Sequence, residues 1–332
     1  MSVLVTGGAG YVGSHCALAL LESGEKVIVL DNLSTGSSNA VPDSATFVLG
    51  DIGDKELVTR IIRRDAVDTI IHLAASTVVP DSVRHPLEYY RNNTANSRTL
   101  IEAAAEENVK NFIFSSTAAV YGGVSDTPLT EANELRPMSP YGVSKMMTER
   151  MLSDTSVAGG PRYVILRYFN VAGADPLGRT GQSTPKATHL IKVACQAALS
   201  KHRDIAVFGT DYPTRDGTCV RDYIHVTDLA QAHVSALDYL RKEGSSEIFN
   251  CGYEHGYSVL EVLHAVQDVS GRKLNVQFSQ RRPGDPPTVV ASSAKIRKAL
   301  SWLPRLNDLK AIVGHALAWE ERLVMMGLSR SR

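Results

Sequence analysis

Short apolar runs alternate with longer stretches of helical periodicity through the first half of the chain. Runs of Val, Ile, Leu and Phe near Gly, Asp or Asn predict β-strands, because these side chains suit a pleated, buried surface. The predicted strands are Val3–Thr6, Lys26–Leu30, Ala45–Leu49, Thr69–Leu73, Asn111–Ser115 and Arg162–Arg167. The predicted helices are Gly10–Ser23, Asp54–Arg64, Pro86–Glu107, Pro140–Asp154, Thr188–Ser200, Val226–Lys242, Val259–Ser270 and Asn307–Glu320. This alternation predicts an α/β fold with a doubly wound parallel sheet covered on both faces.

The second half of the chain breaks this rhythm. Loops rich in Gly, Pro, Thr and Asp occupy residues 173–186, 209–217 and 281–287. They favour a smaller portion that closes over a ligand. We therefore expect a Rossmann-like domain over residues 1–171, with later strand and helix contributions from about 221–252. The smaller, interleaved substrate-binding portion is expected over residues 172–332.

Composition restricts the class of protein. The chain has 332 residues, of which 43% are hydrophobic and 21% are charged, and its 35 basic residues balance 35 acidic ones. A neutral chain of this kind is not typical of proteins that bind nucleic acid or membrane surfaces. No apolar stretch approaches the roughly 18 residues that span a bilayer. The cysteines are far apart and without metal-ligand spacing, which predicts free thiols and a cytoplasmic location: Cys16, Cys195, Cys219 and Cys251.

A glycine-rich turn follows the first predicted strand. Gly7, Gly10 and Gly13 are spaced three apart and lead into a helix. Such a turn lets the backbone approach a pyrophosphate, which the amides and dipole at the helix N-terminus then hold. A plain strand-to-helix turn would look the same. Asp31, at the end of the second strand, favours a bound NAD over NADP because its carboxylate accepts ribose hydroxyls and repels a 2′-phosphate.

Two further segments are consistent with a dinucleotide. Asp51 follows the third strand, where its carboxylate could bond an adenine amine, although it could equally cap the next helix. The small residues around Ala74 follow the fourth strand and would let the backbone approach the cofactor. Taken together with the glycine turn and Asp31, these segments predict a nicotinamide dinucleotide site.

Tyr141 and Lys145 are the main candidates for catalysis. Residues four apart share one face of a helix, so the spacing places an ammonium beside a phenol. A free phenol has a pKa of about 10, and a neighbouring cation lowers it. Tyr141 is then a usable general acid and base. Thr117, just past the fifth strand, adds a hydroxyl near the cofactor crevice, although it could instead cap the next segment.

The motifs TGGAGYVGSH, HLAAS, FIFSSTAAVYG, SPYGVSK, LRYFNVAGADP, DGTCVRDYIHVTDLA and RRPGDPP occur in this order along nearly the whole chain. In this respect the chain resembles the extended short-chain dehydrogenase/reductase family, and within it the branch that epimerises UDP-sugars at carbon 4. The resemblance implies NAD-dependent interconversion of UDP-glucose and UDP-galactose through a 4-keto intermediate.

The resemblance also implies roles for individual residues. The catalytic set would be Thr117, Tyr141 and Lys145. Cofactor contacts would come from Gly7, Gly10, Tyr11, Val12, Gly13, Asp31, Asn32, Asp51, Ile52, Ala74, Ala75, Asn92, Tyr141, Lys145 and Tyr168. Substrate contacts would come from Thr117, Tyr141, Asn170, His189, Arg221, Arg282, Asp285 and Val289. Arg221 and Arg282 would hold the diphosphate by bidentate pairing, and Asp285 would hold the uridine ribose.

Several positions depart from the family pattern. Thr117 replaces a serine and keeps the hydroxyl. Thr77 stands where a lysine often contacts the cofactor phosphate, and His189 replaces an asparagine. Val289 occupies a position that gates the group on the sugar 2-carbon, so the range of accepted sugars stays open.

Three other functions are compatible with the same scaffold. A sugar-nucleotide dehydratase would carry an acid and a base after Thr117, where this chain has Ala118 and Ala119. An epimerase for an N-acetylhexosamine, a pentose or a uronic acid would differ only in its loops. A non-catalytic NAD sensor would typically lack the Tyr141/Lys145 pair. The family resemblance further implies a homodimer formed through the helices Pro86–Glu107 and Pro140–Asp154.

Overall fold

The computed structural model describes residues 1–123, 128–184, 188–200, 204–282 and 284–327. Its largest element is a seven-stranded sheet in the order β10-β6-β5-β4-β1-β2-β3, with every neighbouring pair parallel. The strands are β1 (Ser2–Thr6), β2 (Val27–Asp31), β3 (Thr46–Leu49), β4 (Val67–His72), β5 (Asn111–Thr117), β6 (Arg162–Tyr168) and β10 (Glu247–Cys251). The predicted doubly wound parallel sheet is confirmed.

Helices cover both faces of this sheet, because alternate residues of each strand point to opposite sides. Val3 and Val5 of β1 belong to one apolar cluster, and Leu4 between them belongs to the other. The first cluster includes α1 (Tyr11–Glu22) and α8 (Val226–Arg241). The second includes α2 (Lys55–Asp65), α5 (Asn96–Glu106) and α6 (Pro140–Val157). Apolar burial on both faces explains why these strands read as nearly continuous apolar runs.

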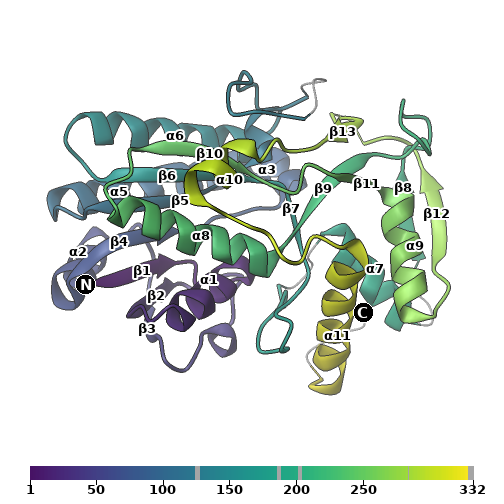
Figure 1. Ribbon diagram of the computed structural model, residues 1–332, viewed down its shortest axis with the longest axis horizontal. Coiled ribbons are helices and arrows are strands. Elements are labelled where there is room, and N and C mark those ends of the chain that lie inside the picture. Colours follow the sequence, from purple (N-terminus) through teal and green to yellow (C-terminus); the bar gives the residue numbers. More distant parts are fainter. Residues whose placement is uncertain (124–127, 185–187, 201–203, 283, 328–332) are drawn as a thin grey trace.

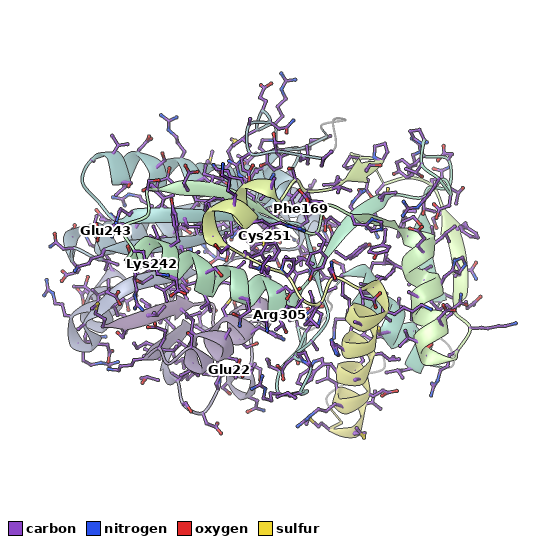
Figure 2. The ribbon with its side chains drawn as sticks, in the orientation of Figure 1. Glu22, Phe169, Lys242, Glu243, Cys251 and Arg305 are labelled. Atoms are coloured by element: carbon purple, nitrogen blue, oxygen red, sulfur yellow. The ribbon has the colours of Figure 1, made fainter. Side chains whose placement is uncertain are left out.

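A smaller part of the molecule lies beyond the carboxyl edge of the sheet (Figure 1). Strand β9 (Val220–His225) pairs with β7 (Asn170–Ala172), β11 (Gly256–Ser258) and β13 (Thr288–Val289). Strand β8 (Asp204–Phe208) pairs with β12 (Asn275–Ser279). Helices α7 (Leu190–Leu199), α9 (Val259–Ser270) and α11 (Leu309–Met325) pack against one another. Figure 2 shows Phe169 and Cys251 in the middle of the molecule, where β6 and β10 end.

The eight predicted helices lie within a few residues of observed ones, with one interruption. The predicted helix Pro86–Glu107 consists of α4 (Pro86–Tyr89), a π-helical turn (Tyr90–Ala95) and α5. The prediction omitted α3 (Val79–Arg84), α10 (Ala294–Leu300), β10 and every strand of the smaller part. Of the predicted loops, Pro185, Lys186 and Pro283 lie outside the described residues. Division of the chain near residue 171 remains a prediction.

Among the described residues, no helix is both long enough and apolar enough to span a membrane.

Candidate active site

The direction of chain winding reverses between β1 and β4. These strands are neighbours in the sheet, but the chain continues from β1 to β2 on one side and from β4 to β5 on the other. Such a switch point opens a crevice at the carboxyl ends of the strands, where open α/β sheets bind ligands. Gly7 follows the end of β1 and Ala74 follows the end of β4, so the glycine turn borders this crevice.

The glycine turn leaves no room for side chains. Gly7 has φ +74°, and a Cβ on it would lie 2.6 Å from the amide nitrogen of Ala74. A Cβ on Gly13 would lie 2.0 Å from the carbonyl oxygen of Gly7. Gly10 is the N-cap residue of α1 and has no side chain, so no side-chain hydrogen bond occupies the first amides of the helix. This cradle fits a pyrophosphate held by backbone amides.

The carboxylates that follow β2 and β3 are held in place by local hydrogen bonds. Asp31 is buried, and its oxygens accept the amides of Ala9 at 2.9 Å and Leu33 at 2.8 Å. Each carboxylate oxygen can accept a second hydrogen bond, which leaves capacity for ribose hydroxyls. The Asn32 amide donates to Asp51 at 2.8 Å, so these two predicted cofactor residues lie side by side.

The other residues predicted to contact the cofactor lie around the same crevice. Asn92 lies in the π-helical turn and donates to the Ser76 hydroxyl at 3.0 Å. The Tyr11 hydroxyl donates to the carbonyl of Gly173 at 2.6 Å, which joins the start of α1 to the segment after β7. Tyr168 ends β6, the neighbour of β5. Of the rest, Val12, Ala74 and Ala75 are half-buried residues and Ile52 is buried.

The three predicted catalytic residues come together at the end of β5. Thr117 is the last residue of β5, and its side chain lies close enough to the Tyr141 phenol to lower the pKa of that phenol. Tyr141 and Lys145 occupy successive turns at the start of α6, which Ser139 caps by accepting the amide of Gly142. Both side chains are almost completely buried. The Lys145 ammonium donates to the carbonyl of Ser115 at 2.9 Å and lies 4.8 Å from the Phe114 ring centre.

Burial determines the proton affinities of this pair. It raises the pKa of Tyr141 to about 12, and the hydrogen bond from Thr117 acts in the opposite direction. Burial lowers the pKa of Lys145 to about 7, against the nearby charge of Glu149. In the protein chain by itself the net pKa of Tyr141 is therefore raised, although the spacing from Lys145 favours a lower one. The cost of placing a phenolate in this buried site exceeds the effect of the neighbouring cation.

Four predicted substrate residues lie on β7, β9 and β13 and in the segment before β13. Arg221 of β9 is opposite Val289 of β13, and two residues further along β9 Tyr223 is opposite Asn170 of β7. Asn170 is exposed at the start of its strand. The Arg221 guanidinium forms an ion pair with Asp285. The structure therefore pairs Arg221, which was predicted to contact the diphosphate, with Asp285, which was predicted to contact the uridine ribose.

The remaining predicted substrate residues lie near the strand and helix of the smaller part. The Arg282 guanidinium lies 3.9 Å from the centre of the Phe208 ring, at the end of β8. His189 precedes α7 and is exposed, and its Nδ1 accepts the side-chain amide of Gln182 at 2.7 Å. Both basic side chains thus have partners of their own.

Sequence reasoning missed several polar residues that brace this site. The Asn93 side chain accepts the amide of Ser76 at 2.8 Å and donates to the Ser144 hydroxyl at 3.1 Å, which links the loop after β4 to α6. Glu149 and Arg167 form a buried ion pair below Lys145. One signal for Glu149 was available, since it follows Lys145 by four residues on α6.

The chain was compared with protein families, and residues 3–252 match the model of the "NAD dependent epimerase/dehydratase family". The chain belongs to this family. Its family resemblance, predicted from the motifs, is thereby confirmed, and so is NAD as the cofactor of the family. The crevice, the glycine cradle and Asp31 fit that cofactor.

Curated and solved relatives extend the comparison. A UDP-glucose 4-epimerase of Azospirillum brasilense is 55% identical over 97% of this chain and 92% of its own length. The structure of a UDP-glucose 4-epimerase from Brucella ovis in complex with NAD has a TM-score of 0.93 and 42% identity, covering 96% of this chain and 97% of its own. That of Bifidobacterium longum, in complex with NAD⁺ and UDP, has a TM-score of 0.90 and 36% identity, covering 97% and 98%.

Proposed function

We propose that this protein interconverts UDP-glucose and UDP-galactose by inverting carbon 4 of the sugar, with NAD as its resident cofactor. The observation that carries the proposal is the meeting of Thr117, Tyr141 and Lys145 at the carboxyl end of β5, on the sheet edge that also carries the glycine cradle. The reactions named for the relatives support the choice of substrate.

Tyr141 and Thr117 handle the proton in this proposal. The Tyr141 oxygen takes the proton of the sugar 4-hydroxyl, while the Thr117 hydroxyl bonds the same oxygen. Bound NAD would supply the hydride acceptor and donor for carbon 4, and its positively charged ring would favour the phenolate form of Tyr141. The 4-keto sugar turns before the hydride returns to its other face. Tyr141 then gives the proton back to the 4-oxygen, so that atoms and charge balance.

Lys145 holds the phenol and the cofactor ribose in place. One of its three N–H donors is used on the Ser115 carbonyl, which fixes the direction of the ammonium. Two donors remain for a ribose hydroxyl and for the Tyr141 oxygen.

The smaller part anchors the nucleotide while the sugar turns. Arg221 and Arg282 are proposed to bind the diphosphate and Asp285 the uridine ribose, with Asn170 and His189 near the sugar. Arginine suits this role because its planar fork matches two phosphate oxygens. Val289 is proposed to limit the group on carbon 2 of the sugar.

A dehydratase reaction is not favoured. Eliminating water needs a further acid and base near the 4-keto sugar. Residues 118–120, which follow Thr117, form a short 3₁₀ turn made of Ala118, Ala119 and Val120. None of these side chains can transfer a proton.

The function is tested by incubating the protein with UDP-glucose, UDP-N-acetylglucosamine, UDP-xylose and UDP-glucuronate in parallel. The 4-epimers are followed by NMR, and UDP-galactose is the expected main product. A dehydrated or decarboxylated product would overturn the proposed reaction. Turnover of none of the four would instead favour the NAD sensor.

Replacing Tyr141 with Phe removes the atom that transfers the proton. We expect the Tyr141→Phe variant to lose turnover and to keep its affinity for UDP, measured by calorimetry. Tyr163→Phe is the matched control, because its hydroxyl bonds Ser153 outside the site. Near-normal epimerisation by Tyr141→Phe would refute the assignment of the proton carrier.

We further propose that the protein is a cytoplasmic homodimer that pairs through α4, α5 and α6. Leu87 on α4 is 80% exposed and Met147 on α6 is 42% exposed, and large exposed apolar side chains favour a covered surface. The double variant Leu87→Glu/Met147→Glu should sediment as a monomer, while Leu303→Glu, at an equally exposed position elsewhere, should sediment like the wild type. The four buried free thiols are consistent with a reducing compartment, which cell fractionation tests.

A further inference from the structure

Helix α6 is attached to the end of β5 at three successive residues. Tyr141, Lys145 and Glu149 are four residues apart, so they lie along one face of α6. Each of them has a partner among the last three residues of β5. The pairs are Tyr141 with the Thr117 side chain, Lys145 with the Ser115 carbonyl, and Glu149 with the Ser116 hydroxyl. The pair of Glu149 with Ser116 therefore joins the same helix to the same strand end as the contacts of Tyr141 and Lys145.

Glu149 is itself held rigidly. It is 4% exposed, and Arg167 of β6, 3% exposed, reaches its two oxygens at 3.0 Å and 2.6 Å. Arg167 also donates to the Tyr121 hydroxyl at 3.0 Å, and that hydroxyl donates to Asn250 at 2.6 Å. The network therefore spans β6, β10 and the segment after β5. Because this network holds the Glu149 carboxylate in place, its hydrogen bond with Ser116 can determine the position of that residue, which precedes Thr117.

The charges around Lys145 show a second effect of Glu149. Lys145 and Arg167 are both buried cations. His72 of β4 and His233 of α8 stay neutral, because burial lowers their pKa values to about 3 and 4. In the protein chain by itself, burial raises the pKa of both neighbouring phenols, Tyr141 on α6 and Tyr168 on β6, so they are uncharged near pH 7.

Glu149 therefore supplies the negative charge in this group. Burial is the main influence on the pKa of Lys145 and lowers it to about 7, and Glu149 raises it. Among the residues that the structure describes, it is the one carboxylate with a resolved effect on this ammonium. The distance between the two groups exceeds that of an ion pair, so the effect acts through space.

We propose that Glu149 is a positioning residue for hydride transfer. It fixes the end of β5 through Ser116 and supplies a negative charge that stabilises the Lys145 ammonium. The proposal rests on the proposed function, because it assigns the residue to that same site. Glu149 acts through Lys145 and Thr117 and does not touch the substrate.

The decisive variant is Glu149→Gln, which keeps the shape and a hydrogen-bond acceptor but removes the charge. The pKa of Lys145 should fall, so the activity lost on raising the pH should be lost about one pH unit lower. At pH 8 this shift reduces the charged fraction, and with it kcat, about tenfold. KM for UDP-glucose should stay within about twofold, because the nucleotide contacts are distant.

Two further variants separate charge from position. Ser116→Ala keeps both charges and removes the hydrogen bond, so kcat should fall without moving the pH profile. Glu149→Asp keeps the charge and should restore the wild-type pH profile at a reduced kcat. If Glu149→Gln does not fold, because Arg167 is left unpaired, the double variant Glu149→Gln/Arg167→Gln removes both buried charges and is measured in its place.

The outcomes are distinguishable. Circular dichroism and urea unfolding establish that each variant is folded, and the NAD released on denaturation establishes that each is loaded. Lack of turnover by the wild type overturns the proposed function. A wild type that turns over, with a Glu149→Gln or double variant whose pH profile and kcat match it, overturns the role of Glu149. For Glu149→Gln, a fall in kcat without any shift of the pH profile would also overturn this role, since loss of packing alone has that effect.

Discussion

At the scale of single residues, burial changes what the spacing of residues predicts. The four-residue interval between Tyr141 and Lys145 correctly places them on one face of α6. The interval does not indicate how far the two side chains are exposed to solvent, and in the structure both are almost fully buried. Burial moves the two pKa values in opposite directions, towards the neutral forms. The Thr117 side chain and Glu149 act against burial at Tyr141 and Lys145, respectively.

The cradle of the cofactor gives a prediction for one residue. Gly7→Ala should destabilise the protein and reduce its NAD content, because the new Cβ would lie 2.6 Å from the backbone nitrogen of Ala74. A positive φ by itself costs an alanine about 1–2 kcal/mol. Urea unfolding and the NAD content of the purified protein are the measurements.

Gly24→Ala is the matched control for this substitution. Gly24 has φ +86°, similar to the +74° of Gly7, but a Cβ there would meet no atom within 4 Å. The Gly24→Ala variant should lose only the stability that the positive φ costs an alanine, and it should keep its NAD. Equal losses of stability and NAD in the two variants would contradict the close approach of the turn to Ala74.

At the scale of elements, helices were predicted well and the strands of the smaller part were not. The helical patterns are long and periodic, whereas β7, β11 and β13 contain three residues or fewer. Strands this short have too few residues for alternation to be recognised. The π-helical turn between α4 and α5 also lacks a sequence signal, because its residues continue the helical pattern. It nevertheless contains Asn92 and Asn93, which bond the loop after β4.

The last helix gives a prediction at this scale. Lys192 of α7 forms a buried ion pair with Glu320 of α11 and also donates to the carbonyl of Gln182. Glu320→Gln would leave the ammonium without its counter-charge, which costs about 3–5 kcal/mol in the free energy of unfolding. Urea unfolding measures this loss.

An exposed pair provides the control for α11. Lys310 and Asp268 are 3.0 Å apart, with side chains 64% and 60% exposed. Asp268→Asn should therefore change the unfolding free energy very little, because water screens this pair. Similar losses for Glu320→Gln and Asp268→Asn would show that α11 is not anchored by the buried pair.

At the scale of the whole molecule, the two faces of the sheet bury histidines in neutral form. Burial lowers the pKa of His72 to about 3 and that of His233 to about 4. In the unfolded chain a histidine has a pKa of about 6.5. As the pH falls from about 6.5 to 4, the unfolded state takes up protons that the folded state does not. Stability is therefore present above this range and is lost within it as the pH falls.

This argument predicts the size of the pH dependence. Each such histidine should contribute about 1.4 kcal/mol of lost unfolding free energy per pH unit. His233→Gln should reduce the slope between pH 6.5 and 5 by that amount, measured by urea unfolding at several pH values. An unchanged slope for His233→Gln would show that this ring is protonated in the folded state.

The sequence by itself determined the parallel α/β architecture, the glycine turn, Asp31 and the Tyr141/Lys145 interval. These features depend on local periodicity and spacing, which a sequence displays directly. Only the tertiary structure decided that β10 joins the sheet beside β6, that Arg221 pairs with Asp285, and that Glu149 joins Ser116 to Arg167. Most of these contacts connect residues that are far apart in the chain. Residues of the same types occur at many other positions, so the sequence does not show which of them pair. Their energies depend on burial, which exists only after the layers have packed together.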